Sequence, residues 1–252
     1  MTDRYLLSTQ GLTKEFKGFV AVKDVSLKVR EGTIHALIGP NGAGKTTFFN
    51  LLTKFLTPTA GQIFYHDANI TALRPAEISR LGIVRSFQIS AVFPHLTALE
   101  NVRVALQRKD GDSFDFWRSD RILDRLDGEA RGLLEAVGLA DRAGVIAAQL
   151  PYGQKRALEL ATTLALDPRL MLLDEPTAGM ASADIERMIA LIRRVSEQRT
   201  IVMVEHNLSV VSALANAVTV LSAGSVLAEG DYESIAKNPQ VIAAYIGVKR
   251  DH

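Results

Sequence analysis

The 252-residue sequence contains no cysteine, which excludes disulfide bonds and thiolate metal sites. It also lacks any uninterrupted apolar run near the roughly 20 residues that a membrane-spanning helix needs. Its start, MTDRYLLSTQ, is polar and charged and holds no apolar signal core. We therefore expect a soluble chain, in a compartment that suits cysteine-free proteins such as the cytosol, which reaches a membrane only through a partner.

An excess of basic charge is missing as well. Lysine and arginine number 29 against 28 acidic residues, so the formal net charge is +1. Dedicated nucleic-acid binders usually carry a basic surplus, and the sequence therefore predicts no nucleic-acid partner. Internal repeats and low-complexity tracts are also absent, and 47% hydrophobic with 23% charged residues is typical of a globular chain.

The spacing of apolar residues changes twice along the chain. Up to residue 88, short alternating stretches predict strands, interrupted by a glycine-rich loop and a helix. The middle of the chain has mainly helical spacing, and after it strands and helices alternate, which favours a largely parallel sheet. The sequence predicts one α/β domain (1–252), with a core of 1–88 and 164–252 and a helical insert at 89–163.

The predicted insert has two notable stretches. Thr97 and Glu100 precede an apolar periodic run and predict a capping box at a helix start. The stretch KDGDSFDFWRSDRILDRLDG is dense in charges of both signs, which is typical of a solvated helix or loop rather than a binding patch. Phe116 and Trp117 are its one hint of a contact surface.

The stretch GPNGAGKT matches the P-loop pattern, with Gly39, Gly44, Lys45 and Thr46 in place, between an apolar strand and a helix. Gly42 and Gly44 let backbone N–H groups converge on phosphate oxygens at the helix N-terminus. In such loops the lysine contacts the β- and γ-phosphates and the hydroxyl binds Mg²⁺. The sequence predicts a nucleotide site here, against the alternative of a chance glycine-rich turn.

Two later strands end in polar residues that suit phosphate chemistry. LMLLDEP ends in Asp174 and Glu175, whose side chains point to opposite faces because they are consecutive on a strand. Ligands sit at the carboxyl edge of such sheets, so we expect Asp174 to hold Mg²⁺ and Glu175 to orient or deprotonate water. TIVMVEH ends at His206, which could contact the γ-phosphate or the water, although a lone histidine is more often structural.

These motifs, in this order, resemble the ATPase subunits of ATP-binding cassette (ABC) transporters over nearly the whole chain. GPNGAGKTT resembles the Walker A motif, RSFQ the Q-loop, LMLLDE the Walker B motif with its catalytic glutamate, and His206 the switch histidine. The resemblance implies a P-loop NTPase (RecA-like) core with an N-terminal antiparallel β-subdomain and a helical subdomain. It implies catalytic roles for Glu175, His206 and Gln88; ATP contacts from Phe16, Asn41, Gly42, Gly44, Lys45, Thr46, Thr47, Tyr152, Gly153 and Gln154; and Mg²⁺ contacts from Thr46, Gln88 and Asp174.

The stretch LPYGQ stands where the family signature, usually LSGGQ, begins a helix. In the family this loop faces the γ-phosphate held by the other subunit of a head-to-tail dimer. Pro151 removes a hydroxyl and a backbone donor. Tyr152 and Gly153 keep their N–H groups, Gln154 is retained from the family motif, and proline suits a first helical turn. We predict a working signature. Ala181 stands where the family's D-loop commonly has aspartate, which departs from the pattern at a cross-subunit contact.

One branch of the family shares three features of this sequence. They are a tyrosine in the signature, a Q-loop like RSFQ, and a C-terminal stretch like NPQVIAAYIG. That branch comprises the larger ATPase subunits of high-affinity uptake systems for branched-chain amino acids. Importers of urea or amides, the exporter of lipopolysaccharide and soluble non-transport ABC ATPases remain open as alternatives.

The resemblance also implies cofactors and partners. They are ATP and Mg²⁺, a second ABC ATPase subunit (identical or paralogous), transmembrane permeases and, indirectly, a periplasmic or extracellular binding protein. Phe93, Pro94 and His95, just after Gln88, are candidates for the permease contact unless they form a buried turn. The implied location is peripheral, on the cytoplasmic face of the inner membrane.

Overall fold

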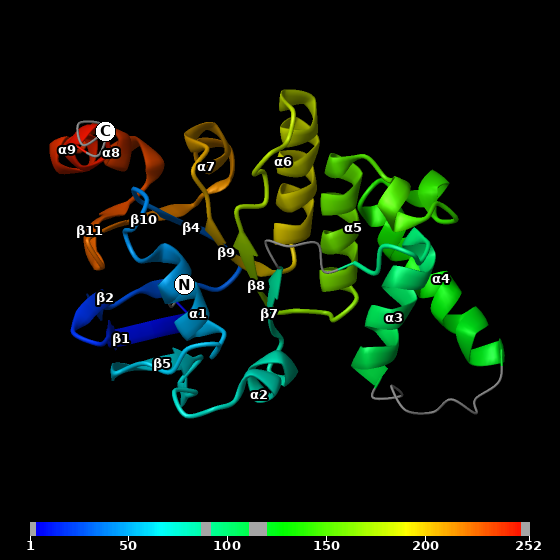
Figure 1. Ribbon diagram of the computed structural model, residues 1–252, viewed down its shortest axis with the longest axis horizontal. Helices are drawn as coiled ribbons and strands as arrows, with labels where there is room; N and C mark the ends of the chain where they lie inside the picture. Colours follow the sequence, from blue (N-terminus) through cyan, green and yellow to red (C-terminus); the bar gives the residue numbers. More distant parts are fainter. Residues whose placement is uncertain (1–3, 87–91, 111–119, 248–252) are drawn as a thin grey trace.

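The computed structural model describes residues 4–86, 92–110 and 120–247, and the fold consists of two sheets and a lobe of helices (Figure 1). The first sheet is antiparallel, in the order β2-β1-β5-β6, with β3 pairing β1. Its strands are β1 (Tyr5–Phe16), β2 (Phe19–Val25), β3 (Lys28–Arg30), β5 (Ala60–Tyr65) and β6 (Ala68–Asn69).

The second sheet forms the centre of the molecule, in the order β11-β10-β4-β9-β8-β7. Its strands are β4 (Ile34–Ile38), β7 (Ile83–Ser86), β8 (Leu170–Asp174), β9 (Thr200–Val204), β10 (Ala217–Ser222) and β11 (Ser225–Gly230). All neighbours are parallel except β11, which pairs β10 antiparallel. Every residue of β4, β8 and β9 is buried, as expected for parallel strands covered on both faces.

The two faces of this sheet contribute to two hydrophobic clusters. On β4, Leu37 packs with Phe48 and Phe49 on the side of the antiparallel sheet, whereas Ala36 and Ile38 pack on the opposite side. This division follows from the alternation of side chains along a strand. The helices are α1 (Lys45–Leu52), α2 (Pro75–Arg80), α6 (Ser182–Ser196), α7 (Leu208–Leu214), α8 (Tyr232–Lys237) and α9 (Pro239–Gly247).

The helical lobe lies beyond the β7 edge of the sheet and comprises α3 (Ala98–Asp110), α4 (Asp120–Ala136) and α5 (Tyr152–Leu164) (Figure 1). The predicted capping box is confirmed: the Thr97 hydroxyl accepts from the N–H of Glu100 at 3.2 Å, and the Glu100 carboxylate accepts from the N–H of Thr97 at 2.7 Å. Phe116 and Trp117 lie outside the described residues. Among the described helices, none is long and apolar enough to cross a membrane.

The predicted fold class, an α/β core with an antiparallel subdomain and a helical insert, is confirmed. The helices of the lobe run from Ala98 to Leu164, between β7 and β8 of the core sheet. The limits of 89 and 163 for the insert stay a prediction.

Candidate functional site

The glycine-rich loop between β4 and α1 has a backbone that requires its glycines. Gly39, Gly42 and Gly44 all have positive φ, of 148°, 78° and 97°. A Cβ atom on Gly39 would lie 2.1 Å from the carbonyl oxygen of Leu221, and one on Gly44 would lie 2.4 Å from that of Ala21. A Cβ on Gly42, by contrast, would meet nothing within 4 Å. The loop is therefore pressed against protein on one side and open on the other, as a backbone cradle for phosphates must be.

Lys45 is the first residue of α1 and carries the cation of this loop. Its ammonium group is buried and donates to the carbonyl oxygens of Gly39 at 2.6 Å and Pro40 at 3.0 Å. Burial lowers the pKa of Lys45, while the negative charges of Glu175 and Asp174 act in the opposite direction. These two carboxylates therefore lie within electrostatic reach of the loop.

The remaining predicted residues of the loop surround the start of α1. Thr46 is exposed and Thr47 is half-buried in its first turn, which contains no acidic residue, and Asn41 is exposed in the preceding loop. The N-terminus of a helix carries a partial positive charge, so an anion placed there is stabilised. The loop, its lysine and the two hydroxyls thus fit a polyphosphate.

Asp174 ends β8 and is buried against a residue that the sequence did not single out. Arg85, on the neighbouring strand β7, donates to the carboxylate of Asp174 and, at 2.5 Å, to the side-chain oxygen of Asn50 on α1. One guanidinium group thereby joins the Walker B strand to the helix after the P-loop. In the sequence, Arg85 is the first residue of RSFQ, a stretch that was noted only for Gln88. Gln88 lies outside the described residues.

The donors predicted for the metal suit Mg²⁺, which takes few of its ligands from the protein. Across the described residues, no group of three or more His, Cys, Asp or Glu side chains could hold a metal ion. Mg²⁺ commonly uses one or two carboxylates and takes its other ligands from phosphates and water. The carboxylate of Asp174 and the hydroxyl of Thr46 match this donor set.

The structure brings Glu175 and His206 together. Nε2 of His206 lies 2.7 Å from Oε1 of Glu175, at the ends of the adjacent parallel strands β9 and β8. Glu175 has a φ of 49°, in the left-handed region that costs free energy for a residue with a side chain. Its N–H is fixed by the carbonyl oxygen of Val204 at 2.9 Å. The sequence predicted both residues but not their contact, and the backbone of β9 holds Glu175 in place for it.

Glu205 is a functional candidate that sequence reasoning missed. Its buried carboxylate accepts from the N–H and hydroxyl of Thr177 and from the N–H groups of His206 (2.8 Å) and Asn207 (3.0 Å). It therefore ties the loop after Glu175 to the residue that contacts Glu175. An acid that ends an apolar strand directly before His206 was the signal that could have found it.

The predicted signature stands at the start of α5, where Pro151 is the N-cap residue with a φ of −54°. The first helical hydrogen bond runs from the N–H of Lys155 to the carbonyl oxygen of Pro151 at 3.0 Å. The N–H groups of Tyr152, Gly153 and Gln154 precede it, so they have no acceptor within the helix and point from its positive end. This is the backbone arrangement that a phosphate-facing signature needs.

The predicted site residues thus fall into three places. Lys45, Asp174, Glu175 and His206 gather at the carboxyl ends of β4, β8 and β9, which are neighbours in the sheet. The signature belongs to the helical lobe and contacts the loop after Glu175 through Tyr152. Phe16 is 41% exposed at the end of β1, with the ammonium of Lys14 5.1 Å from its ring centre. Its contact with adenine stays a prediction.

Comparison with known proteins agrees with this arrangement. A family model described as ABC transporter matches residues 22–178, and one described as branched-chain amino acid ATP-binding cassette transporter matches residues 225–251. The high-affinity branched-chain amino acid transport ATP-binding protein BraF of Pseudomonas aeruginosa is 39% identical, over 97% of this chain and 99% of its own. The corresponding protein of Escherichia coli, LivG, is 39% identical over 96% and 98% of the two chains.

Solved structures show the same fold. The crystal structure of the ADP conformation of MJ1267, an ATP-binding cassette of an ABC transporter, has a TM-score of 0.85 at 27% identity, over 96% of this chain and 99% of that one. A dimeric post-hydrolysis structure of the cassette MJ0796, bound to ADP and Pi, has a TM-score of 0.76 at 27% identity, over 90% and 98%. The chain therefore belongs to the ABC transporter family, as one of its ATPase subunits.

Proposed function

We propose that this chain powers an importer of branched-chain amino acids from the cytoplasmic face of the inner membrane, as a peripheral subunit. The full-length similarity to BraF and LivG and the match at residues 225–251 support this substrate class. In this proposal, ATP closes two such subunits head to tail around two nucleotides, and hydrolysis separates them. The movement drives permease helices that receive the amino acid from a binding protein outside.

The observation that carries the hydrolytic part is the contact between His206 and Glu175 beside the P-loop. Glu175 orients and deprotonates the attacking water, and His206 holds the carboxylate and the water in line with the γ-phosphate. Lys45 and the backbone of the loop bind the phosphates, and Asp174 with Thr46 holds Mg²⁺. Bound Mg²⁺ supplies positive charge that offsets the charge of the phosphate oxygens.

The head-to-tail dimer is supported by the backbone at the start of α5. Its N–H groups at Tyr152 and Gly153 have no acceptor within the helix, and Tyr152 is exposed. A structure of the similar cassette MJ0796 is dimeric with ADP and Pi. A γ-phosphate presented by a second subunit would satisfy these donors and the helix dipole together.

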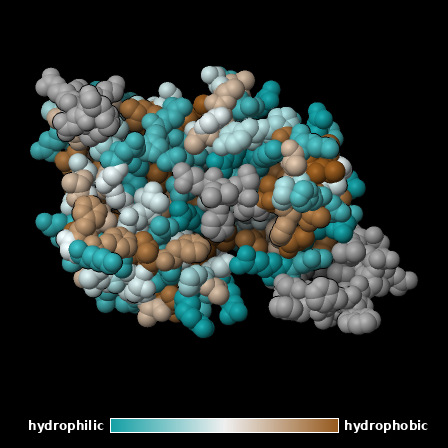
Figure 2. Space-filling view, in the orientation of Figure 1, coloured by the Kyte–Doolittle hydropathy of each residue, from teal (hydrophilic) through white to brown (hydrophobic). Residues whose placement is uncertain are grey.

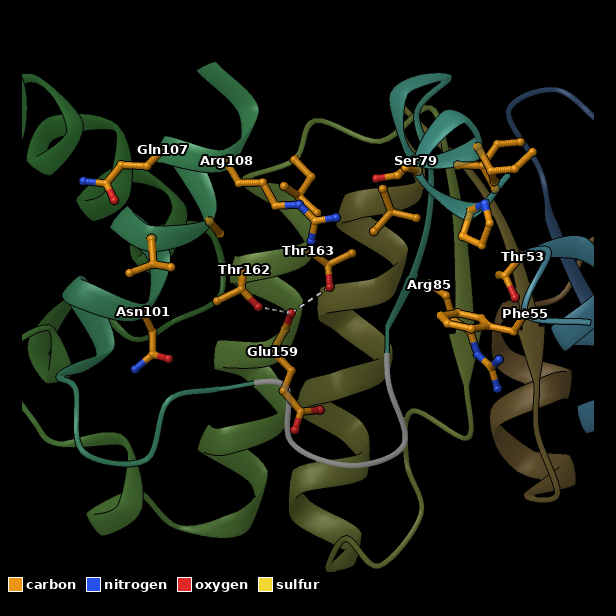
Figure 3. Close-up of a pocket in the computed structure, with 18 of the residues that line it drawn as sticks. Thr53, Phe55, Ser79, Arg85, Asn101, Gln107, Arg108, Glu159, Thr162 and Thr163 are labelled. Carbon is orange, nitrogen blue, oxygen red and sulfur yellow. Dashed lines mark hydrogen bonds between the residues drawn. The ribbon is translucent and has the colours of Figure 1, made fainter. Parts of the chain in front are cut away.

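A groove between the core and the helical lobe supports docking of the permeases. It has a volume of about 640 Å³ and is lined by Thr53 and Phe55 after α1, by α2 and by β7 on one side, and by α3 and α5 on the other (Figure 3). The surface is indented between the two lobes, with hydrophobic atoms in the indentation (Figure 2). Such a mostly apolar groove suits an inserted helix of another subunit.

One of the three residues predicted to contact the permeases lines this groove. Phe93 lines it and is 54% exposed, and Phe55 and Val104 add further exposed apolar surface. Pro94 and His95 are also exposed, so the alternative of a buried turn is wrong for this segment. Arg85 lines the same groove and contacts Asp174, which gives a direct physical connection from the groove to the nucleotide site.

Reconstitution tests the substrate class. The chain, its permeases and its partner ATPase in liposomes should show ATP hydrolysis that rises when a binding protein loaded with leucine, isoleucine or valine is added. Stimulation by a urea-loaded binding protein, or transport of lipopolysaccharide, would move the assignment to those systems. Full ATPase activity that no binding protein or permease alters would favour a soluble non-transport ATPase.

A groove variant tests the docking. Val104→Glu places a carboxylate in the groove, and burying it under a permease helix without a partner is costly. We expect Val104→Glu to lose co-purification with the permeases while it binds ATP normally. Ile242→Glu, at an apolar position on α9 that is also exposed, should retain it. Equal co-purification of the two variants would reject the groove as the docking site.

A further inference from the structure

The side chain of Tyr152 connects the signature helix to the loop that follows Glu175. Its hydroxyl donates to the carbonyl oxygen of Ala178 at 2.9 Å, 26 positions away in the sequence. A Cβ built on Gly179 would lie 3.5 Å from the tyrosine ring, so the ring lies beside this loop. The tyrosine is exposed but reaches across to a different segment of its own chain.

The tyrosine is itself held in position from within α5. Nε of Arg156 donates to the Tyr152 hydroxyl at 3.2 Å, and the guanidinium group lies 5.4 Å from the ring centre. Arg156 is in turn buried and paired with Glu159 at 2.8 Å. One turn of helix thus fixes the direction of the phenol, so that its single proton is directed to Ala178.

The loop that Tyr152 contacts is joined to the hydrolytic pair at its other end. It begins at Glu175, and the N–H of Ala178 returns to the Glu175 carbonyl oxygen at 3.1 Å. Thr177 donates from its N–H to Glu205 at 3.1 Å, and Glu205 accepts from the N–H of His206. Four hydrogen bonds therefore lead from Tyr152, through this loop, to the segment that carries His206.

We propose that Tyr152 is a positioning residue that holds residues 175–181 in register with the signature helix. Through this contact, the signature that a chain presents to its partner is mechanically joined to the same chain's own Glu175 and His206. The inference rests on the proposed function, because it assumes that the signature acts on the partner's nucleotide. Pro151 has no hydroxyl and Ala181 no carboxylate, so neither offers a side-chain hydrogen bond between these segments.

The test replaces Tyr152 by phenylalanine, which keeps the ring and removes the hydrogen bond to Ala178. Tyr5→Phe, at the start of β1 in the antiparallel sheet, is the matched control. In the nucleotide-free full chain, hydrogen exchange at the amides of Thr177, Ala178 and Met180 should become about fivefold faster in Tyr152→Phe. The amides of Ala178 and Met180 are hydrogen-bonded within the loop and that of Thr177 to Glu205, so all three report opening of the loop. Exchange in the P-loop should not change.

The second readout is kinetic. We expect Tyr152→Phe to lower kcat for ATP by about fivefold, with the Kd for ATP, titrated on the monomeric chain, unchanged within about twofold. Tyr5→Phe should match the wild type in both.

Unchanged exchange in Tyr152→Phe would overturn the contact, and faster exchange with an unchanged kcat would overturn the positioning role. The exchange measurement needs neither permease nor dimer. A wild-type transporter that ignores branched-chain amino acids would therefore reject the proposed substrate and leave this result standing.

Discussion

Nε2 of His206 and Oε1 of Glu175 lie 2.7 Å apart, although 31 positions separate the two residues in the sequence. The contact arises because β8 and β9 are parallel neighbours that end at the same edge of the sheet. Residues in such direct contact act as a unit, and their substitutions are not additive. Each therefore has to be tested alone and in combination.

Glu175→Gln should stop turnover and leave ATP binding intact. The amide keeps the shape of the side chain but cannot take a proton, and loss of a general base typically costs about 10²–10⁴ in rate. Because hydrolysis separates the proposed dimer, the variant should accumulate an ATP-bound dimer on size exclusion. Phosphate release at the wild-type rate would remove Glu175 from the mechanism.

His206→Ala should also slow phosphate release without weakening ATP binding. If His206 acts through Glu175, the double variant with Glu175→Gln should be no slower than Glu175→Gln alone. Single-turnover rates of the wild type, both single variants and the double variant give the coupling directly. Losses that multiply would show that His206 acts independently of the glutamate.

Lys45→Ala should weaken nucleotide binding itself. Lys45 supplies the loop's side-chain cation, and the carbonyl oxygens that its ammonium contacts belong to the loop. Titration with a fluorescent ATP analogue should separate this variant, with a raised Kd, from Glu175→Gln, with an unchanged one. Normal ATP affinity and turnover in Lys45→Ala would refute the P-loop assignment.

Glu205→Gln should lower both stability and the rate of hydrolysis. The two carboxylate oxygens accept from Thr177, His206 and Asn207, and an amide nitrogen cannot accept in place of one of them. Leaving buried donors without an acceptor costs about 1–3 kcal/mol, measurable by urea unfolding. Glu186→Gln, at an exposed position on α6, is the control and should change neither quantity.

His35 should make the chain less stable in acid. It is buried on β4 with Nε2 2.8 Å from the hydroxyl of Thr219, and that hydroxyl donates to Glu229, so Nε2 carries the proton of a neutral ring. Burial lowers its pKa from 6.5 to about 4. Between these values the unfolded chain binds a proton that the folded chain does not, so stability falls as the pH falls through this window.

The loss assigned to His35 amounts to about 3 kcal/mol between pH 7 and pH 4. His35→Gln, which can still donate to Thr219, should remove this part of the pH dependence. Urea unfolding of both proteins at pH 7, 5.5 and 4 measures the difference. Parallel curves for the two proteins would show that His35 titrates normally in the folded chain.

The sequence predicted those parts of the site that are contiguous or that end a strand. Gly39 to Thr46 are contiguous, and Asp174, Glu175 and His206 each follow an apolar run, so the local pattern was enough. Arg85 and Glu205 were missed because their importance depends on which strands become neighbours. Nothing local says that Arg85 will contact Asp174 on the neighbouring strand, or that Glu205 will accept from Thr177.

The same limit applies to the signature. The resemblance placed Tyr152 through its backbone N–H, and the structure adds a side-chain contact to Ala178 that depends on packing of α5 against the loop after β8. The α/β core and the helical insert followed from alternating elements and the change of apolar spacing, whereas the antiparallel subdomain was implied by the family resemblance. The exact limits of the insert could not, because the ends of helices depend on tertiary contacts as much as on propensity.

Helix α5 has Gly153 at one end and Thr162 and Thr163, which line the groove, near the other. This helix has 13 residues and is therefore about 20 Å long. One inserted residue would turn one end by about 100° relative to the other, so that the signature would face away from the incoming phosphate while the groove stayed in place. Gaining or losing a single residue between the ends of α5 would therefore misalign the signature with the groove.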